Sequence, residues 1–327
     1  MNRKHTYSAT FILLLSLGLL LSACSSGTST TAPATNTENT ATTESIPTER
    51  TLTDAIGNVV KVPANPQRVL ASYLEDPLVA LGVTPVAQWA IGEGNTQGYL
   101  QKQLANVPPI DSTLPYEAVL NTNPDLILMD SAEMVAGDKY AQYNQIAPTY
   151  VVGKKQNNDW RDELITIGDV LGKSDEAKKV LVDYEAKAKT AKDQLQQQIG
   201  SESAAVLWVT GKNIYVVSRN LSSGDVLYND LGLKAPAVVE EISKSGEANW
   251  QAISLEKLTD LDADYLFLIN STEQSKEDIT SPAVWQNIPA VKKGHVYDFS
   301  ADSSWLYTGA IANGQIIDDV LASVLKK

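Results

Sequence analysis

Two glutamates at matched places in the two halves of the chain are the first residues whose type and spacing could do chemistry. Glu117 and Glu256 each stand two residues after a turn-forming residue, Pro115 or Ser254, at the start of a short helical pattern. The positive end of a helix dipole favours a carboxylate there, and an exposed carboxylate can accept paired hydrogen bonds from an arginine. These side chains can therefore bind a basic partner, or they can be ordinary glutamates that begin helices.

Residues for catalysis or for direct metal binding form no recognisable pattern. The sequence has no nucleophile elbow, no cysteine–histidine pair and no zinc-binding helix. His295 is the one histidine after residue 5, whereas zinc or manganese sites usually assemble several. The 13 tyrosines could hold iron, but no spacing supports that role. We therefore expect a binding protein and not an enzyme, with no cofactor and no metal ligand of its own.

The two glutamates belong to a stretch that occurs twice. In residues 115–131 and 254–270, the glutamate is followed by a helical pattern, by an aspartate (Asp125 or Asp264) and by an apolar run. A short apolar run after a turn signal is typical of a strand that is buried on both faces, as in a parallel sheet. The repeat therefore predicts a helix, a turn and a buried strand in each half, and hence two similar α/β lobes.

The first residues do not belong to the predicted fold. An apolar run over residues 11–21 follows a charged start, and it is shorter than the roughly 20 residues that span a bilayer. The run is typical of a secretory signal, and it ends in Leu-Ser-Ala-Cys, which resembles the lipobox of bacterial lipoproteins. That resemblance implies a signal peptide over residues 1–23 and lipid attachment at Cys24, the only cysteine. The alternative is a secreted protein with an incidental cysteine.

A flexible tether is predicted after Cys24. Residues 24–49 are rich in serine and threonine and have no apolar periodicity. Two or more acyl chains would hold the protein stably on a membrane. We therefore expect a lipid-anchored protein on the extracytoplasmic face of the cell membrane, at a Gram-positive cell surface.

The charge of the chain excludes one class of partner. The formal net charge is −13, whereas nucleic-acid binding requires a basic face. The sequence also has no glycine-rich phosphate loop of either common kind. We therefore expect no nucleic-acid partner.

The rest of the chain predicts two lobes and one long helix. Strands alternate with helices in each half, which indicates doubly wound parallel sheets. Residues 175–199 are rich in Ala, Lys, Gln and Glu, which favour helix, and a helix of that length would reach about 37 Å. We predict an N-terminal lobe over residues 50–170, a connecting backbone helix over 171–200 and a C-terminal lobe over 201–327, with little hinge bending.

Two short helices are predicted from local signals. Asp76 is expected to cap a helix over residues 77–81, because Pro77 suits the first helical position. A second short helix is predicted near residues 282–285.

From about residue 50 to its end, the chain resembles the helical-backbone (class III) substrate-binding proteins of ABC importers, which carry ferric siderophores, haem or cobalamin. The lipobox, the paired Glu–helix–Asp–strand units, the single long helix and the terminal helix carry the resemblance. It implies a ligand cleft between two α/β lobes and a protein that acts as a monomer. It also implies that Glu117 and Glu256 dock on arginines of a membrane permease, which works with an ATPase.

Aromatic residues in the loops resemble those of the hydroxamate-siderophore binders. That group has a Trp-x-Tyr before the last helix, here Trp305 and Tyr307, and a tryptophan before the second Glu unit, here Trp250. Tyr73 and Trp89 end strands of the first lobe. Aromatic rings at strand ends suit a bulky, partly apolar metal chelate. We predict that all five line the cleft and bind the ligand, although they could instead cover the lobe cores.

The charged residues narrow the class of ligand. The tryptophan and arginine that many Gram-positive hydroxamate binders carry before their Val-Leu-Tyr helix are not in register here, and Arg219, three residues early, is the candidate replacement. The chain has five arginines and no basic cluster near the predicted cleft loops, which does not suit anionic complexes. We predict a ferric siderophore of hydroxamate or citrate–hydroxamate type, in which the siderophore alone holds the iron. Ferric citrate, a catecholate siderophore and cobalamin are the alternatives.

Overall fold

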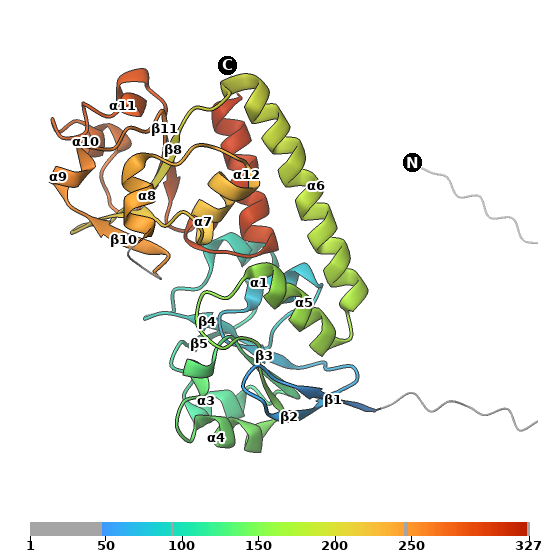
Figure 1. Cartoon of the computed structure of the whole chain (residues 1–327). Helices are drawn as coiled ribbons and strands as arrows, with labels where there is room; N and C mark the ends of the chain where they lie inside the picture. Colours follow the sequence, from blue (N-terminus) through green and yellow to red (C-terminus); the bar gives the residue numbers. More distant parts are fainter. Residues whose placement is uncertain (1–47, 93, 245–247, 326–327) are drawn as a thin grey trace, which may run out of the picture. The chain divides into compact units, whose positions relative to one another are not determined.

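The computed structural model describes residues 48–92, 94–244 and 248–325 (Figure 1). The predicted signal peptide, Cys24 and the predicted tether up to residue 47 lie outside these residues. The described chain forms an N-terminal lobe, a long helix and a C-terminal lobe.

Parallel strands form the centre of the N-terminal lobe. Its strands are β1 (Glu49–Thr53), β2 (Val59–Pro63), β3 (Val69–Ala71), β4 (Gln88–Ala90), β5 (Pro109–Asp111), β6 (Leu126–Met129) and β7 (Thr149–Val151). The main sheet has the order β3-β6-β7, β4 pairs with β5, and both sets are parallel, whereas β1 and β2 form an antiparallel hairpin. Every residue of β6 is buried, as expected for a strand covered on both faces.

Helices surround these strands. They are α1 (Glu75–Ala80), α2 (Gln101–Leu104), α3 (Tyr116–Asn121), α4 (Lys139–Ile146) and α5 (Trp160–Leu171), with the short 3-10 helices η1 (Gly98–Leu100) and η2 (Ala132–Val135). Local signals fix the ends of α5. The Asp159 side chain accepts the N–H of Arg161 at 2.8 Å, and Gly172 ends the helix with a φ of 72°, where glycine is favoured.

The predicted connecting helix is present as α6 (Ser174–Ile199), which has 26 residues. It packs against α5 and against the last helix, α12 (Ala310–Val324), and Figure 1 shows α12 beside it. Its buried face includes Ala177, Tyr184 and Leu195. The helix therefore adds to the core shared by the two lobes.

The C-terminal lobe has a mixed sheet. Its strands are β8 (Ala204–Val209), β9 (Ile214–Val217), β10 (Trp250–Ile253), β11 (Tyr265–Asn270) and β12 (Val296–Ser300), in the order β10-β9-β8-β11-β12. Strands β8, β11 and β12 are parallel, but β9 is antiparallel to both β8 and β10. The connection between β8 and β9 is a short turn, which allows only an antiparallel pair.

The helices of this lobe are short except for the last one. They are α7 (Ser222–Asp225), the π-helix η3 (Val226–Asp230), α8 (Ala237–Ser243), α9 (Leu255–Leu258), α10 (Lys276–Thr280), α11 (Pro289–Lys293), the 3-10 helix η4 (Ser304–Leu306) and α12. The predicted helix at residues 282–285 is wrong, because turns connect α10 to α11 there. Pro289 instead begins α11 at the first helical position.

The repeated aspartate has the same structural role in both lobes. The Asp125 carboxylate accepts the N–H of Arg68 at 2.9 Å, and the Asp264 carboxylate accepts the N–H of Ser203 at 3.0 Å. Arg68 directly precedes β3 and Ser203 directly precedes β8, and these strands pair with β6 and β11 from the residue after each aspartate. The repeat therefore fixes the register of two neighbouring parallel strands at their first pair.

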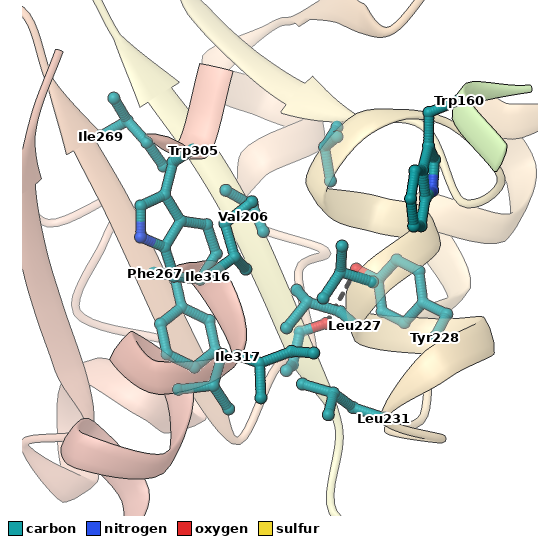
Figure 2. Packing of buried hydrophobic residues seen from close by; sticks show 14 of the residues in the cluster. Trp160, Val206, Leu227, Tyr228, Leu231, Phe267, Ile269, Trp305, Ile316 and Ile317 are labelled. Atoms are coloured by element: carbon teal, nitrogen blue, oxygen red, sulfur yellow. Dashed lines mark hydrogen bonds between the residues drawn. The ribbon is translucent and has the colours of Figure 1, made fainter. Parts of the chain in front are cut away.

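Trp305 belongs to the core of the C-terminal lobe, as Figure 2 shows. Its side chain is 0% exposed. The ring stacks on Phe267 with a centroid distance of 4.9 Å, and its Nε1 donates to Asp319 at 2.9 Å. The prediction that Trp305 lines the cleft is therefore wrong, because this ring fills the space between the sheet and α12.

Candidate ligand-binding site

A cleft lies between the strand ends of the N-terminal lobe and the start of α12. Ser72 and Tyr73, which follow β3, and Asp130, which follows β6, line it from the N-terminal lobe. Residues 306–310, which lead into α12, line it from the C-terminal lobe, together with Asn249. Its volume is about 180 Å³. The carboxyl ends of parallel strands are where such sheets bind ligands, so this cleft is the candidate site.

Aromatic rings from both lobes meet at the cleft. Tyr73 lies 4.7 Å from Trp89 and 6.3 Å from Tyr307 between ring centroids, and Tyr99 lies 5.0 Å from Tyr307. Tyr73, Trp89 and Tyr307 are among the residues that line the cleft. Tyr73 has a φ of 57°, and a strained backbone of this kind is common at functional sites. A direct role of these rings in binding remains a prediction.

Two other predicted ligand contacts lie elsewhere. Arg219 forms an ion pair with Glu240 at 2.5 Å, and its guanidinium lies 5.8 Å from the centre of the Tyr228 ring. These residues border a different groove. Trp250 packs edge-on against Trp208 at 5.9 Å and does not line the cleft, although its neighbour Asn249 does. The prediction of cleft placement is therefore wrong for Arg219 and Trp250, because a glutamate on α8 and a tryptophan on β8 hold them elsewhere.

Asp76 links the two lobes and does not cap its own helix. Its carboxylate accepts the N–H groups of Ile311 at 3.1 Å and Ala312 at 2.9 Å, at the start of α12, and the hydroxyl of Tyr99 at 3.0 Å. Burial raises the pKa of Asp76 to about 6, although these hydrogen bonds act to lower it. The predicted local cap is therefore wrong: no side chain caps α1, and Asp76 caps α12 of the other lobe instead.

The close fit around Asp76 also explains a glycine. Gly309, directly before α12, has a φ of 140°, and a Cβ there would lie 2.3 Å from Cγ of Asp76. Neither Asp76 nor Gly309 was recognised as part of the site region. Their pairing leaves no local signal, because the two partners are more than 230 residues apart in the chain.

A second buried acid, Glu75, holds a residue that lines the cleft. Glu75 is 1% exposed, and its carboxylate accepts the N–H of Trp89 at 2.7 Å and the side-chain amide of Gln97 at 3.1 Å. Burial raises the pKa of Glu75 to about 7. The hydrogen bond from the Trp89 N–H to Glu75 fixes the backbone of β4 at Trp89, whose side chain lines the cleft.

Two further acids line the cleft itself. The Asn158 amide donates to the backbone carbonyl of Asp130 at 3.3 Å and to Oε1 of Glu163 at 3.2 Å. The hydroxyl of Ser72 donates to the Asp130 carboxylate at 3.3 Å. Burial raises the pKa of Asp130, and burial together with the charge of Asp130 raises the pKa of Glu163 to about 7. No lysine or arginine lines the cleft within the described residues.

A comparison with protein families places the chain. Residues 71–303 match the model of a family described as periplasmic binding protein. The chain belongs to the periplasmic binding protein family. The match covers most of both lobes and the long helix between them, and it ends shortly before residues 306–310, which also line the cleft.

Two curated relatives from Bacillus subtilis and one solved structure agree with this family. The chain is 29% identical to YfiY, a probable siderophore-binding lipoprotein, over 99% of both proteins. It is 30% identical to FhuD, an iron(3+)-hydroxamate-binding protein, over 74% of this chain and 76% of FhuD. A FhuD fold-family structure from a ferrichrome ABC transporter of the same organism matches with a TM-score of 0.69 and 26% identity, over 84% of this chain and 100% of that one. The predicted fold, two α/β lobes joined by one long helix, is confirmed.

The two predicted docking glutamates are exposed. Glu117 lies in the first turn of α3 and Glu256 in the first turn of α9. Neither carboxylate forms an ion pair with another described residue, so both are available to a partner. Their role in docking remains a prediction.

His295 and the acidic residues were also compared with the requirements of a metal site. The His295 ring stacks on Tyr265 at 4.6 Å, which is a packing role. Among residues 48–92, 94–244 and 248–325, no group of three or more His, Cys, Asp and Glu side chains could hold a metal ion. Within the same ranges, no helix has the length and apolar character needed to cross a bilayer.

Proposed function

We propose that this periplasmic binding protein is the substrate-binding lipoprotein of an ABC importer for a ferric siderophore of hydroxamate type. The cleft binds the complex, the siderophore holds the iron, and the protein performs no catalysis and needs no cofactor. The relatives that are named for siderophore or iron(3+)-hydroxamate binding support this ligand class.

One observation in this chain carries the proposal. The cleft combines rings from both lobes, Tyr73, Trp89 and Tyr307, with acids, and the described residues that line it include no lysine or arginine. Rings offer a bulky chelate a large contact area. Catecholate and citrate complexes of iron are anionic, and they need arginine or lysine around them. A neutral or cationic hydroxamate complex needs neither, so it fits this lining best.

The size of the cleft adds a requirement. Ligand pockets for drug-sized molecules have volumes of about 300–1,000 Å³, whereas this cleft has about 180 Å³. A ferric siderophore must therefore extend beyond the mouth or displace a side chain. Tyr73 is suited to such movement, because it is 39% exposed and its ring packs near those of Trp89 and Tyr307.

Delivery follows from the exposed glutamates and the lipid anchor. Glu117 and Glu256, one on each lobe, pair with arginines of a permease, and the ATPase of the importer acts through that permease. Lipid at Cys24 holds the protein, as a monomer, at the extracytoplasmic face of the membrane. No nucleic acid takes part.

A fluorescence titration tests the proposed ligand class. Six tryptophans make quenching by a coloured iron complex easy to follow in the full chain, purified in detergent. The panel is a ferric trihydroxamate, a citrate–hydroxamate complex, a ferric tris-catecholate, ferric citrate and cobalamin. Saturation at submicromolar concentration by the hydroxamate complexes alone is expected. Tight binding of the catecholate, citrate or cobalamin instead would contradict the proposed ligand class and leave the family assignment intact.

A further inference from the structure

We propose that the cleft selects an iron chelate that carries a positive charge, and that Asp130 and Glu163 receive this charge. The inference rests on the proposed function and narrows its substrate class, from ferric hydroxamates in general to those that bear a protonated amine.

The position of the two acids is the first step. Asp130 follows the central strand β6, and Glu163 lies in the first turn of α5. Asn158 donates one hydrogen bond toward each of them, to the backbone carbonyl of Asp130 and to the carboxylate of Glu163. Both acids line the same cleft as Tyr73 and Tyr307. A ligand that fills this cleft therefore meets both acidic residues as well as the rings.

The absence of a protein cation beside them is the second step. Within the described residues, neither Asp130 nor Glu163 forms an ion pair with a lysine or arginine. Arg161 is next to this region, but it pairs with Asp225 at 3.3 Å and Asp230 at 2.6 Å. Burying part of a carboxylate without a cation beside it costs desolvation free energy. A bound cation would offset this cost, which the free protein bears alone.

Two lysines near Glu163 border a groove other than the cleft. Lys154 and Lys155 border a separate groove that Glu163 also borders, together with Asp159 and Asp162. Neither lysine forms an ion pair with Glu163. Their groove does not include Asp130 or any of the rings of the cleft. These lysines therefore do not supply the positive charge that the cleft lacks.

Three versions of one chelate test the inference. The probe is a linear ferric trihydroxamate that ends in a primary amine, compared with its N-acetylated and its N-succinylated forms, so that the ligand charge falls from positive through neutral to negative with little other change. In the full chain in detergent, we expect the amine form to bind at least about tenfold more tightly than the acetylated form, and the succinylated form most weakly. Added salt should reduce these differences.

Two double variants identify the groups responsible. Asp130→Asn with Glu163→Gln should remove the preference, so that the amine and acetylated forms bind this variant with similar affinity, and urea unfolding with a single cooperative transition shows that the variant is folded. The matched control is Asp175→Asn with Glu176→Gln, which removes the same two charges from exposed positions at the start of α6. This control should keep the preference.

The outcomes separate this inference from the proposed function. Equal binding of all three chelates by the natural protein would overturn the charge selectivity and leave hydroxamate binding intact. A preference that survives in the Asp130 and Glu163 variant would show that other groups receive the charge. Binding of none of the three would overturn the proposed function itself.

Discussion

The two lobes share one repeated unit but contribute to the cleft in different ways. In both lobes the repeated aspartate, Asp125 or Asp264, fixes the first pair of two parallel strands. Yet the N-terminal lobe sends side chains from its strand ends into the cleft, whereas the C-terminal lobe buries Trp305 and contributes mainly the short segment before α12. The repeat therefore encodes the scaffold, and the ligand site depends on residues outside it.

The largest expected effects come from two variants of neighbouring aromatic residues, one in the core and one in the cleft. Trp305→Ala removes a fully buried ring and should lower the free energy of unfolding by about 3–5 kcal/mol. Tyr307→Ala should affect stability much less and weaken binding of a ferric hydroxamate roughly tenfold, which is about 1.4 kcal/mol. Urea unfolding and ligand titration measure the two effects. A Trp305→Ala protein of normal stability would contradict the placement of this ring in the core.

The contact that joins the lobes should be sensitive to a single methyl group. A Cβ at Gly309 would meet the Asp76 carboxylate at 2.3 Å, in a backbone conformation with φ of 140°, so Gly309→Ala should cost about 2–4 kcal/mol of stability. Gly211→Ala is the control, because no atom lies within 4 Å of its Cβ position. Urea unfolding should distinguish them, and equal stability of the two variants would show that this contact contributes little.

If both lobes dock on the permease, the two glutamates should act alike. Glu117→Ala with Glu256→Ala should leave ligand affinity unchanged and reduce uptake of the iron chelate by cells about tenfold, because charge-assisted pairs with the permease are lost. Each single variant should have a similar, smaller effect. Glu176→Ala with Glu277→Ala, at exposed positions on α6 and α10, is the control. Normal uptake by the first double variant would refute the docking role.

The smallest expected effect is that of pH on stability. It should arise mainly from buried acids of the N-terminal lobe. Burial raises the pKa of Glu75 and Glu163 to about 7 and that of Asp76 to about 6. Between their ordinary values and these values the folded protein binds more protons than the unfolded chain, so stability falls as the pH rises. The melting temperature should therefore be higher at pH 5 than at pH 7.5.

A conservative variant tests whether the buried acids cause this pH dependence. Glu75→Gln keeps an acceptor for the N–H of Trp89 and removes the ionisable group, so the change in melting temperature between pH 5 and pH 7.5 should become smaller. A melting temperature that rises with pH in the natural protein would contradict the assignment.

The sequence was sufficient where a structure depends on neighbouring residues. Asp159 and Gly172 bound α5, and the apolar runs became the buried strands β6 and β11, as predicted. The sequence was insufficient where a side chain has a distant partner. Arg219 lies in a turn and pairs with Glu240 on α8. Trp305 packs on Phe267 and donates to Asp319 of α12, whereas Tyr307 lines the cleft. The spacing of these residues in the sequence does not show which of them lie in the core, in the cleft or in an ion pair elsewhere.

The cap on α12 also has a consequence for the order of folding. Asp76 belongs to the N-terminal lobe, whereas its partners, Ile311 and Ala312, are synthesised more than 230 residues later. The Asp76 carboxylate therefore lacks these two donors until α12 has been synthesised. Contacts so distant along the chain form slowly, so a chain that loses α12 leaves the Asp76 carboxylate with the Tyr99 hydroxyl as a donor but without the two backbone N–H groups.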